Sequence, residues 1–140
     1  MRRRKDRRLA GAAVAVVVLL AATHSHTGAA VPAAAVAAGG GNEALANAMA
    51  AAAPYGWTGS QTTCLDELWT RESNFGTEAT NQQSGAYGIP QSLPASKMAA
   101  AGADWQTNPA TQIRWGLSYI AATYGTPCNA WSHEEGFSWY

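Results

Sequence analysis

The stretch CLDELWTRESNF, residues 64–75, has the spacing of an amphipathic helix with one irregular position. At about 100° per residue, three residues define its apolar face: Leu65, Leu68 and Trp69. Asp66 and Glu67 point away from that face, and Thr63 is the expected N-cap. Glu72 instead projects between Leu68 and Trp69. The helix therefore places a carboxylate on the face that it needs to bury.

A carboxylate in that position has three explanations. It pairs with a cation, it reaches solvent from the end of the apolar stripe, or it lies in a cleft where it takes part in chemistry. Arg71 points off the face, so a local ion pair is not expected, although Arg114 can approach from elsewhere. Periodicity alone favours the end of the stripe. In a cleft, desolvation would raise the pKa of Glu72 and make it a proton donor near neutral pH, as glycoside cleavage requires of its acid.

The first 30 residues have the layout of a secretory signal peptide. MRRRKDRR is basic, the 14 residues LAGAAVAVVVLLAA are apolar, and small residues precede Ala30. A membrane anchor is the alternative, but a spanning helix needs about 20 apolar residues. VPAAAVAAGGG, residues 31–41, is an Ala/Gly-rich linker. We therefore expect a secreted protein, free of the membrane after cleavage, whose folded domain covers residues 42–140.

The charge and the cysteines of residues 31–140 narrow the class of protein. Three Lys and Arg stand against eight Asp and Glu, a net charge of −5, so nucleic acid is not an expected partner. Cys64 and Cys128 are an even pair in an exported chain, which predicts a disulfide. The bond would join the helix of Glu72 to the C-terminal segment and add about 4 kcal/mol of stability. Two cysteines alone make a poor metal site.

The domain is predicted to be mainly α, without internal repeats. Residues 42–53 are expected to form a short helix before Pro54. Residues 81–94, rich in Gly and Pro, are expected to be irregular. A second short helix, residues 95–101, should stop at Gly102.

The clearest helix is predicted within TNPATQIRWGLSYIAATYGTP, residues 107–127. Asn108 caps it, Pro109 takes the first helical position, and Gly125 follows its end. Its narrow apolar stripe consists of Ile113, Gly116, Leu117, Ile120 and Tyr124. The glycine within this stripe implies the close approach of another element. The closing segment, residues 129–140, is too short to assign, but its aromatic side chains are expected to avoid water.

Three motifs follow one another along this domain: LWTRESNF (68–75), SGAYGIPQ (84–91) and NPATQIRWGLSYI (108–120). Together they resemble the soluble lytic transglycosylase (SLT-like) domain of the lysozyme-like superfamily. In that family a Glu-Ser pair ends a helix, a Gly-Ala-x-Gly-(Leu/Ile)-x-Gln segment follows, and a later helix completes the pattern. The resemblance covers residues 42–140 and is greatest to short secreted actinobacterial members. It implies a compact lysozyme-like helical domain that cleaves the β-1,4 bond between N-acetylmuramic acid and N-acetylglucosamine in peptidoglycan.

The resemblance also implies roles for site residues. Glu72 would be the catalytic acid/base, and Ser73 the adjacent hydroxyl that supports the site. Gln91, with the backbone around Tyr87 and Gly88, would line the substrate groove. A glycine lets the backbone approach a polar ligand closely, and a tyrosine ring can cover a sugar face. The alternative for Tyr87 and Gln91 is a loop packed by its own side chains.

Other motif residues have structural explanations. Three are accounted for as a cap and core positions: Asn108, Ile113 and Gly116. Core packing is also favoured for Trp69 and Trp115. The chain departs from the family pattern at Pro90, where methionine is common, and at YGTPCNAW (124–131), which does not reproduce a late Tyr-Asn motif. These departures leave the remote side of the cleft unassigned.

The chemistry that the resemblance implies needs Glu72 alone, with no metal or cofactor, and yields a 1,6-anhydro product from peptidoglycan glycan strands. Two alternatives remain open. A lysozyme-type muramidase would hydrolyse the same bond with a second carboxylate, but Asp104, Glu78 and Glu134 are each expected at the surface. A non-catalytic wall-binding module would hold the glycan without cleaving it. His133 is expected to be solvated rather than a metal ligand, and the protein is expected to be a cell-wall-associated monomer.

Overall fold

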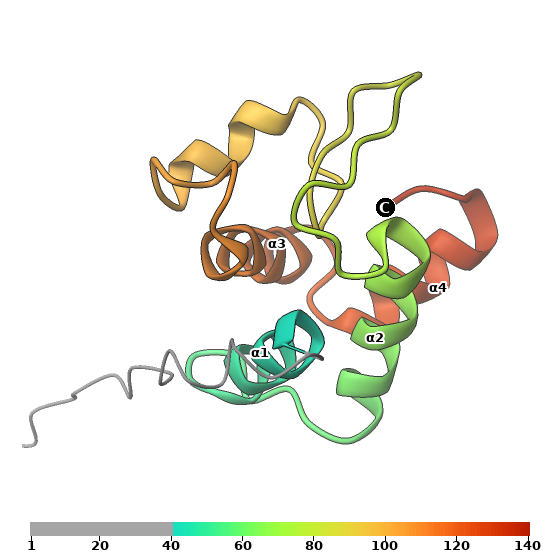
Figure 1. Cartoon of the computed structure of the whole chain (residues 1–140). Coiled ribbons are helices and arrows are strands. Elements are labelled where there is room, and N and C mark those ends of the chain that lie inside the picture. The colour runs from blue at the N-terminus through green and yellow to red at the C-terminus, as the bar shows by residue number, and fades with distance from the viewer. Residues whose placement is uncertain (1–40) are drawn as a thin grey trace, which may run out of the picture.

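The computed structural model describes residues 41–140, which form five helices (Figure 1). They are α1 (Gly41–Ala51), α2 (Ser60–Ser73), the short 3₁₀ helix η2 (Ala95–Ala100), α3 (Pro109–Thr123) and α4 (Pro127–Phe137). Within residues 41–140 the β pairing is limited to two isolated bridges, both made by Tyr87. The predicted mainly α domain is therefore confirmed. The expected signal peptide, and all of the expected linker except Gly41, lie outside the described residues.

The helices pack around one core. Helices α2 and α4 lie against each other and are joined by the Cys64–Cys128 disulfide, which confirms the predicted bond. Helix α1 packs against α2 and α3, and α3 also contacts η2 and α4. Figure 1 shows the segment between α2 and η2 extending beyond the ends of the helices. Among residues 41–140 no helix combines the length and the apolarity that a membrane crossing requires.

Helix α2 has the apolar face predicted from its sequence, because Leu65, Leu68 and Trp69 are fully buried. It begins at Ser60, about one turn before the predicted start, so Gly59 and not Thr63 is the N-cap. No side chain caps this end, and nothing in the sequence therefore marks it. Asp66, which was expected at the surface, is half-buried.

Helix α3 begins as predicted, because Asn108 accepts a hydrogen bond from the Ala110 amide and Pro109 takes the first helical position. It ends at Thr123, shortly before Gly125, whose φ of +80° favours glycine. Four positions of the predicted stripe are buried: Ile113, Gly116, Leu117 and Ile120. This buried stripe faces the core, and α1, η2 and α4 all contact the helix.

Gly116 is the point at which two other elements approach α3. A Cβ here would lie 2.6 Å from Cζ2 of Trp69 and 3.0 Å from Cβ of Pro90. We expect Gly116→Ala to lower the free energy of unfolding by about 1–2 kcal/mol. Overpacking costs about 1–3 kcal/mol, which outweighs the roughly 1 kcal/mol that alanine gains over glycine in a helix. Urea unfolding measures the difference.

Gly136→Ala in α4 is the matched control, since a Cβ there meets nothing within 4 Å. This variant should be neutral or slightly more stable than the wild type. If Gly116→Ala were as stable as Gly136→Ala, the close approach would not constrain the fold.

The closing segment forms helix α4, which spacing alone did not assign. Thr126 caps it by accepting a hydrogen bond from the Asn129 amide, and its buried face consists of Pro127, Ala130 and Glu134. Phe137 and Trp139 follow the last buried position and are 65% and 60% exposed. The expectation that the closing aromatic residues avoid water is wrong for these two, because no other element covers them in the described part of the chain.

Candidate active site

Glu72 lies in the last turn of α2 and is half-buried, on the same face as the buried Leu68 and Trp69. Ser73 follows it and ends the helix. The Ser73 hydroxyl donates to the carbonyl of Ile89 at 2.7 Å. This bond holds the Gly/Pro-rich segment against the end of the helix that carries Glu72.

The surroundings of Glu72 favour its protonated form. Burial, followed by the negative charge of Glu134 and a hydrogen bond with that carboxyl, raises the pKa of Glu72 from 4.5 to about 7. The guanidinium of Arg71 opposes this shift but does not overcome it. Glu72 can therefore hold a proton near neutral pH and give it up to a reacting group.

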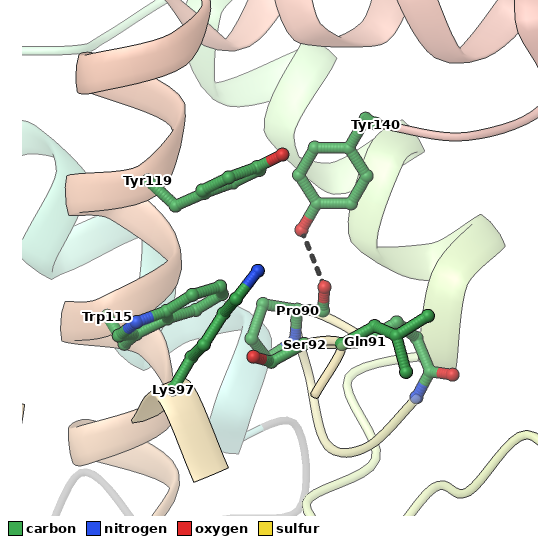
Figure 2. Close-up of a pocket in the computed structure, with 8 residues that line it drawn as sticks. Pro90, Gln91, Ser92, Lys97, Trp115, Tyr119 and Tyr140 are labelled. Carbon is green, nitrogen blue, oxygen red and sulfur yellow. Dashed lines mark hydrogen bonds between the residues drawn. The ribbon is translucent and has the colours of Figure 1, made fainter. Parts of the chain in front are cut away.

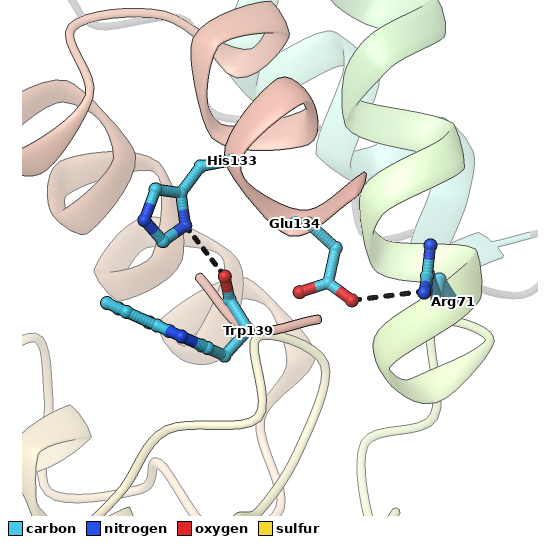
Figure 3. A network of polar contacts seen from close by, with 4 residues as sticks. All are labelled: Arg71, His133, Glu134 and Trp139. Carbon is cyan, nitrogen blue, oxygen red and sulfur yellow. Dashed lines mark hydrogen bonds and ion pairs between the residues drawn. The ribbon is translucent and has the colours of Figure 1, made fainter. Parts of the chain in front are cut away.

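Glu134 is buried on the face of α4 that packs against α2, with 3% exposure. The expectation of a surface position is wrong, because Glu134 shares its helix face with the buried Pro127 and Ala130. Its Oε1 forms an ion pair with Nε of Arg71 at 3.1 Å (Figure 3). Its Oε2 is buried and has no hydrogen-bond partner within residues 41–140. Glu134 is the acid whose charge helps to raise the pKa of Glu72.

Tyr140 connects α2 to the Gly/Pro-rich segment. Its hydroxyl accepts a hydrogen bond from Nε1 of Trp69 at 2.8 Å and donates to the carbonyl of Pro90 at 3.0 Å. Burial, followed by the nearby charge of Glu72, raises the pKa of the Tyr140 phenol well above 10. The hydroxyl therefore stays neutral at any working pH. Sequence reasoning did not single out this residue.

A pocket of about 80 Å³ opens beside Tyr140 (Figure 2). Trp115 and Tyr119 of α3 form one wall, with their ring centroids 5.3 Å apart and their planes within 7° of parallel. Trp115, for which core packing was favoured, is thus half-buried in a pocket wall. Flat aromatic faces beside polar groups suit a ligand with both apolar and hydroxylated faces. The lining residues are Pro90, Gln91, Ser92, Leu93, Lys97, Trp115, Tyr119 and Tyr140.

Glu72 is not one of the lining residues, but its charge acts on Tyr140, which lines the pocket. Of the predicted groove residues, Gln91 lines the pocket, whereas Tyr87 and Gly88 do not. The hydroxyl of Tyr87 donates to the carbonyl of Gln106 at 2.8 Å, and its ring packs edge-on against Trp105. The Gln91 amide donates to the carbonyls of Ala79 and Gly88. Tyr87 therefore packs against the segment before α3, whereas Gln91 both lines the pocket and braces its own loop.

Gln112 of α3 is a fully buried polar residue that sequence reasoning missed. Its Nε2 donates to the carbonyls of Thr77 and Trp105, and its Oε1 accepts a hydrogen bond from the Ile89 amide. A Cβ at Gly88 would lie 2.5 Å from this Oε1, which explains the glycine there. One side chain thus fixes three segments around the site. Gln112 lies four residues before Gly116, which is on the apolar stripe, and this spacing could have indicated that Gln112 is buried.

The other candidate residues have local contacts. Asp104 is exposed and accepts hydrogen bonds from Asn108 and Thr111, which hold the pKa of its carboxyl below the usual range. Glu78 is exposed, as predicted. Nδ1 of His133 donates to the carbonyl of Trp139 at 2.8 Å (Figure 3), so this residue is only partly solvated. Residues 41–140 contain no group of three or more His, Cys, Asp and Glu side chains placed to share a metal ion.

No protein-family model, curated protein or solved structure matches this chain.

Proposed function

We propose that this protein is a secreted peptidoglycan lytic transglycosylase of the lysozyme-like superfamily, with Glu72 as its single catalytic acid/base. The observation that carries the proposal is the half-buried Glu72 carboxyl, whose pKa is raised to about 7, at the point where α2 meets the SGAYGIPQ segment. The aromatic pocket beside Tyr140 supports binding of a sugar chain. The disulfide supports an oxidising compartment, as expected of an exported protein.

In the proposed reaction, protonated Glu72 gives its proton to the glycosidic oxygen as the bond to C1 of N-acetylmuramic acid breaks. The N-acetyl group of the substrate stabilises the positive charge that develops on the sugar, which is a recognised alternative to an enzyme nucleophile. Glu72, now a carboxylate, takes the proton of the muramic acid 6-hydroxyl, and that oxygen closes the 1,6-anhydro ring. The acid is thus regenerated within one cycle, and no metal or cofactor takes part.

The position of Glu134 favours this chemistry over lysozyme-type hydrolysis. Two-carboxylate glycosidases hold the groups about 5–5.5 Å or about 6.5–9.5 Å apart, so that the reacting sugar fits between them. Glu134 is instead only 3% exposed and is held in an ion pair by Arg71, so it is not placed to face a reacting sugar. Asp104 and Glu78, the other acids considered for this role, are exposed.

Product analysis tests the proposal. Digestion of purified sacculi should release fragments whose muramic acid ends carry the 1,6-anhydro ring, as detected by mass spectrometry. A muramidase digest run in parallel provides the reducing-end control. Reducing ends from this protein would assign hydrolysis instead. Sedimentation with sacculi and no released fragments would assign a wall-binding module and end the enzyme proposal.

A further inference from the structure

The aromatic pocket contains a cation that has no partner. Residues 41–140 carry three cations against eight acids, a net charge of −5. Arg71 forms an ion pair, and Arg114 donates to a backbone carbonyl at 3.0 Å. The Lys97 ammonium lines the pocket and makes no ion pair, hydrogen bond or cation–π contact in the described part of the chain. Of the three cations, Lys97 is therefore the one left to bind an anion from outside the chain.

The short helix η2 fixes the position of Lys97 at the pocket. Met98, the next residue, is fully buried. Arg114 of α3 donates to the carbonyl of Ala101, directly after η2, and so ties η2 to α3. Figure 2 shows the Lys97 side chain beside the Trp115 ring, with its ammonium end directed toward the space between α3 and the Gly/Pro-rich segment. An anion bound there would meet a cation whose backbone is already ordered.

The lining of the pocket suits a carboxylate attached to a partly apolar group. No lining residue is acidic, so nothing in the wall repels an anion. Pro90 and Leu93 add apolar surface beside the stacked rings of Trp115 and Tyr119. The volume of about 80 Å³ is several times the 10–15 Å³ or so that one water needs, so a group of a few heavy atoms fits. A lysine ammonium supplies a compact charge for such a group.

We propose that this pocket binds a carboxylate carried by the glycan strand, and that Lys97 is the residue that selects for it. The inference rests on the proposed function, because peptidoglycan supplies the anion. Two parts of peptidoglycan carry a carboxylate: the lactyl ether of N-acetylmuramic acid where no peptide is attached, and the peptide stem. A strand of N-acetylglucosamine alone carries neither. The pocket therefore distinguishes peptidoglycan from a neutral glycan with the same backbone.

Three soluble disaccharides test the proposal by binding alone. Chitobiose is neutral, and N-acetylglucosaminyl-N-acetylmuramic acid adds the lactyl carboxylate. The same disaccharide with an alanyl-isoglutamine stem has its lactyl carboxyl blocked as an amide and a carboxylate on the peptide. None of the three contains the bond that the proposed enzyme cleaves, so turnover does not interfere. The Trp115 indole N–H, assigned with Trp115→Phe, reports each titration by NMR.

The wild type should bind at least one anionic disaccharide about two- to fivefold more tightly than chitobiose, the range of an exposed ion pair. Sodium chloride at about 0.5 M should reduce this preference. Tighter binding of the free disaccharide would identify the lactyl carboxylate as the bound group, and tighter binding of the stem form would identify the peptide. Equal binding of all three ligands, or no shift of the Trp115 signal with any of them, would overturn the proposal.

Variants of Lys97 separate its charge from its shape. Lys97→Gln should bind the three ligands equally, Lys97→Arg should keep the preference, and Lys97→Glu should reverse it. Since Lys97 is exposed, all three variants should fold. A preference that survives in Lys97→Gln would also overturn the proposal, and 1,6-anhydro fragments released from sacculi would then still support the enzyme. A preference that depends on Lys97 in a protein that releases no fragments would reject the enzyme and retain the anion site.

Discussion

Replacing Glu72 with glutamine should slow the release of fragments from purified sacculi by about 10²–10⁴-fold at pH 6, the range that general acid–base catalysis contributes. Glutamine has nearly the same shape as glutamic acid but has no proton to give to the glycosidic oxygen. Because Glu72 is proposed to act first as the acid and then as the base, the substitution affects both halves of the reaction. The initial rate of muropeptide release measures the effect. Glu78→Gln, at an exposed position, is the matched control and should keep the wild-type rate.

The Glu72→Gln protein should remain folded and should be more stable than the wild type above pH 7. Since the pKa of Glu72 rises from 4.5 to about 7 on folding, the contribution of Glu72 to stability is fully present below pH 4.5 and is lost as the pH rises to about 7. The Glu72→Gln variant does not lose stability in this way, because glutamine does not ionise. At pH 8 the variant should gain about 1 kcal/mol over the wild type, with solvent screening of the half-exposed group allowed for. Urea unfolding at pH 5 and pH 8 measures this, and a folded variant with full activity would remove Glu72 from the mechanism.

Local residue spacing is sufficient to predict the features that depend on a single helix. A rotation of about 100° per residue puts Glu72 on the face of Leu68 and Trp69 whichever element covers that face. Asn108 and Pro109 mark the start of α3 through contacts within the first turn. Gly116 likewise indicates that another element approaches α3 closely. Only the fold shows that the approaching residues belong to α2 and to the Gly/Pro-rich segment.

The environment of Glu134 could not be predicted in this way, because other elements create it. This residue is buried only because α4 packs on α2, and its cation, Arg71, belongs to a helix that lies far earlier in the chain. Trp115 has helical spacing that fits a core residue, yet the pocket beside Tyr119 and Tyr140 leaves it half-exposed. In both cases the side chain lies on a predictable helix face, and tertiary packing decides what that face meets.

Removal of the disulfide should cause the largest change in stability. Cys64 and Cys128 are separated by 64 positions, and the chain-entropy relation for a loop of this size gives a loss of about 4 kcal/mol in the Cys64→Ser/Cys128→Ser double variant. Since a small domain has a total stability of roughly 5–15 kcal/mol, its Tm should fall by about 20 °C. Circular dichroism during heating measures the shift. The wild type in reductant should show the same fall, whereas the double variant should not respond to reductant.

The effect of this double variant on activity should depend on temperature and not on pH. A disulfide acts mainly on the unfolded chain, and α2 and α4 keep their other contacts, including the Arg71–Glu134 ion pair. Well below its new Tm, the double variant should therefore retain the wild-type rate. The alkaline limb of its pH–rate profile should also match that of the wild type. Near that Tm, activity and helical signal should disappear together. A Tm within about 3 °C of the wild type would contradict the stabilising role. A pH–rate profile whose alkaline limb is displaced at low temperature would mean that the disulfide also shapes the surroundings of Glu72.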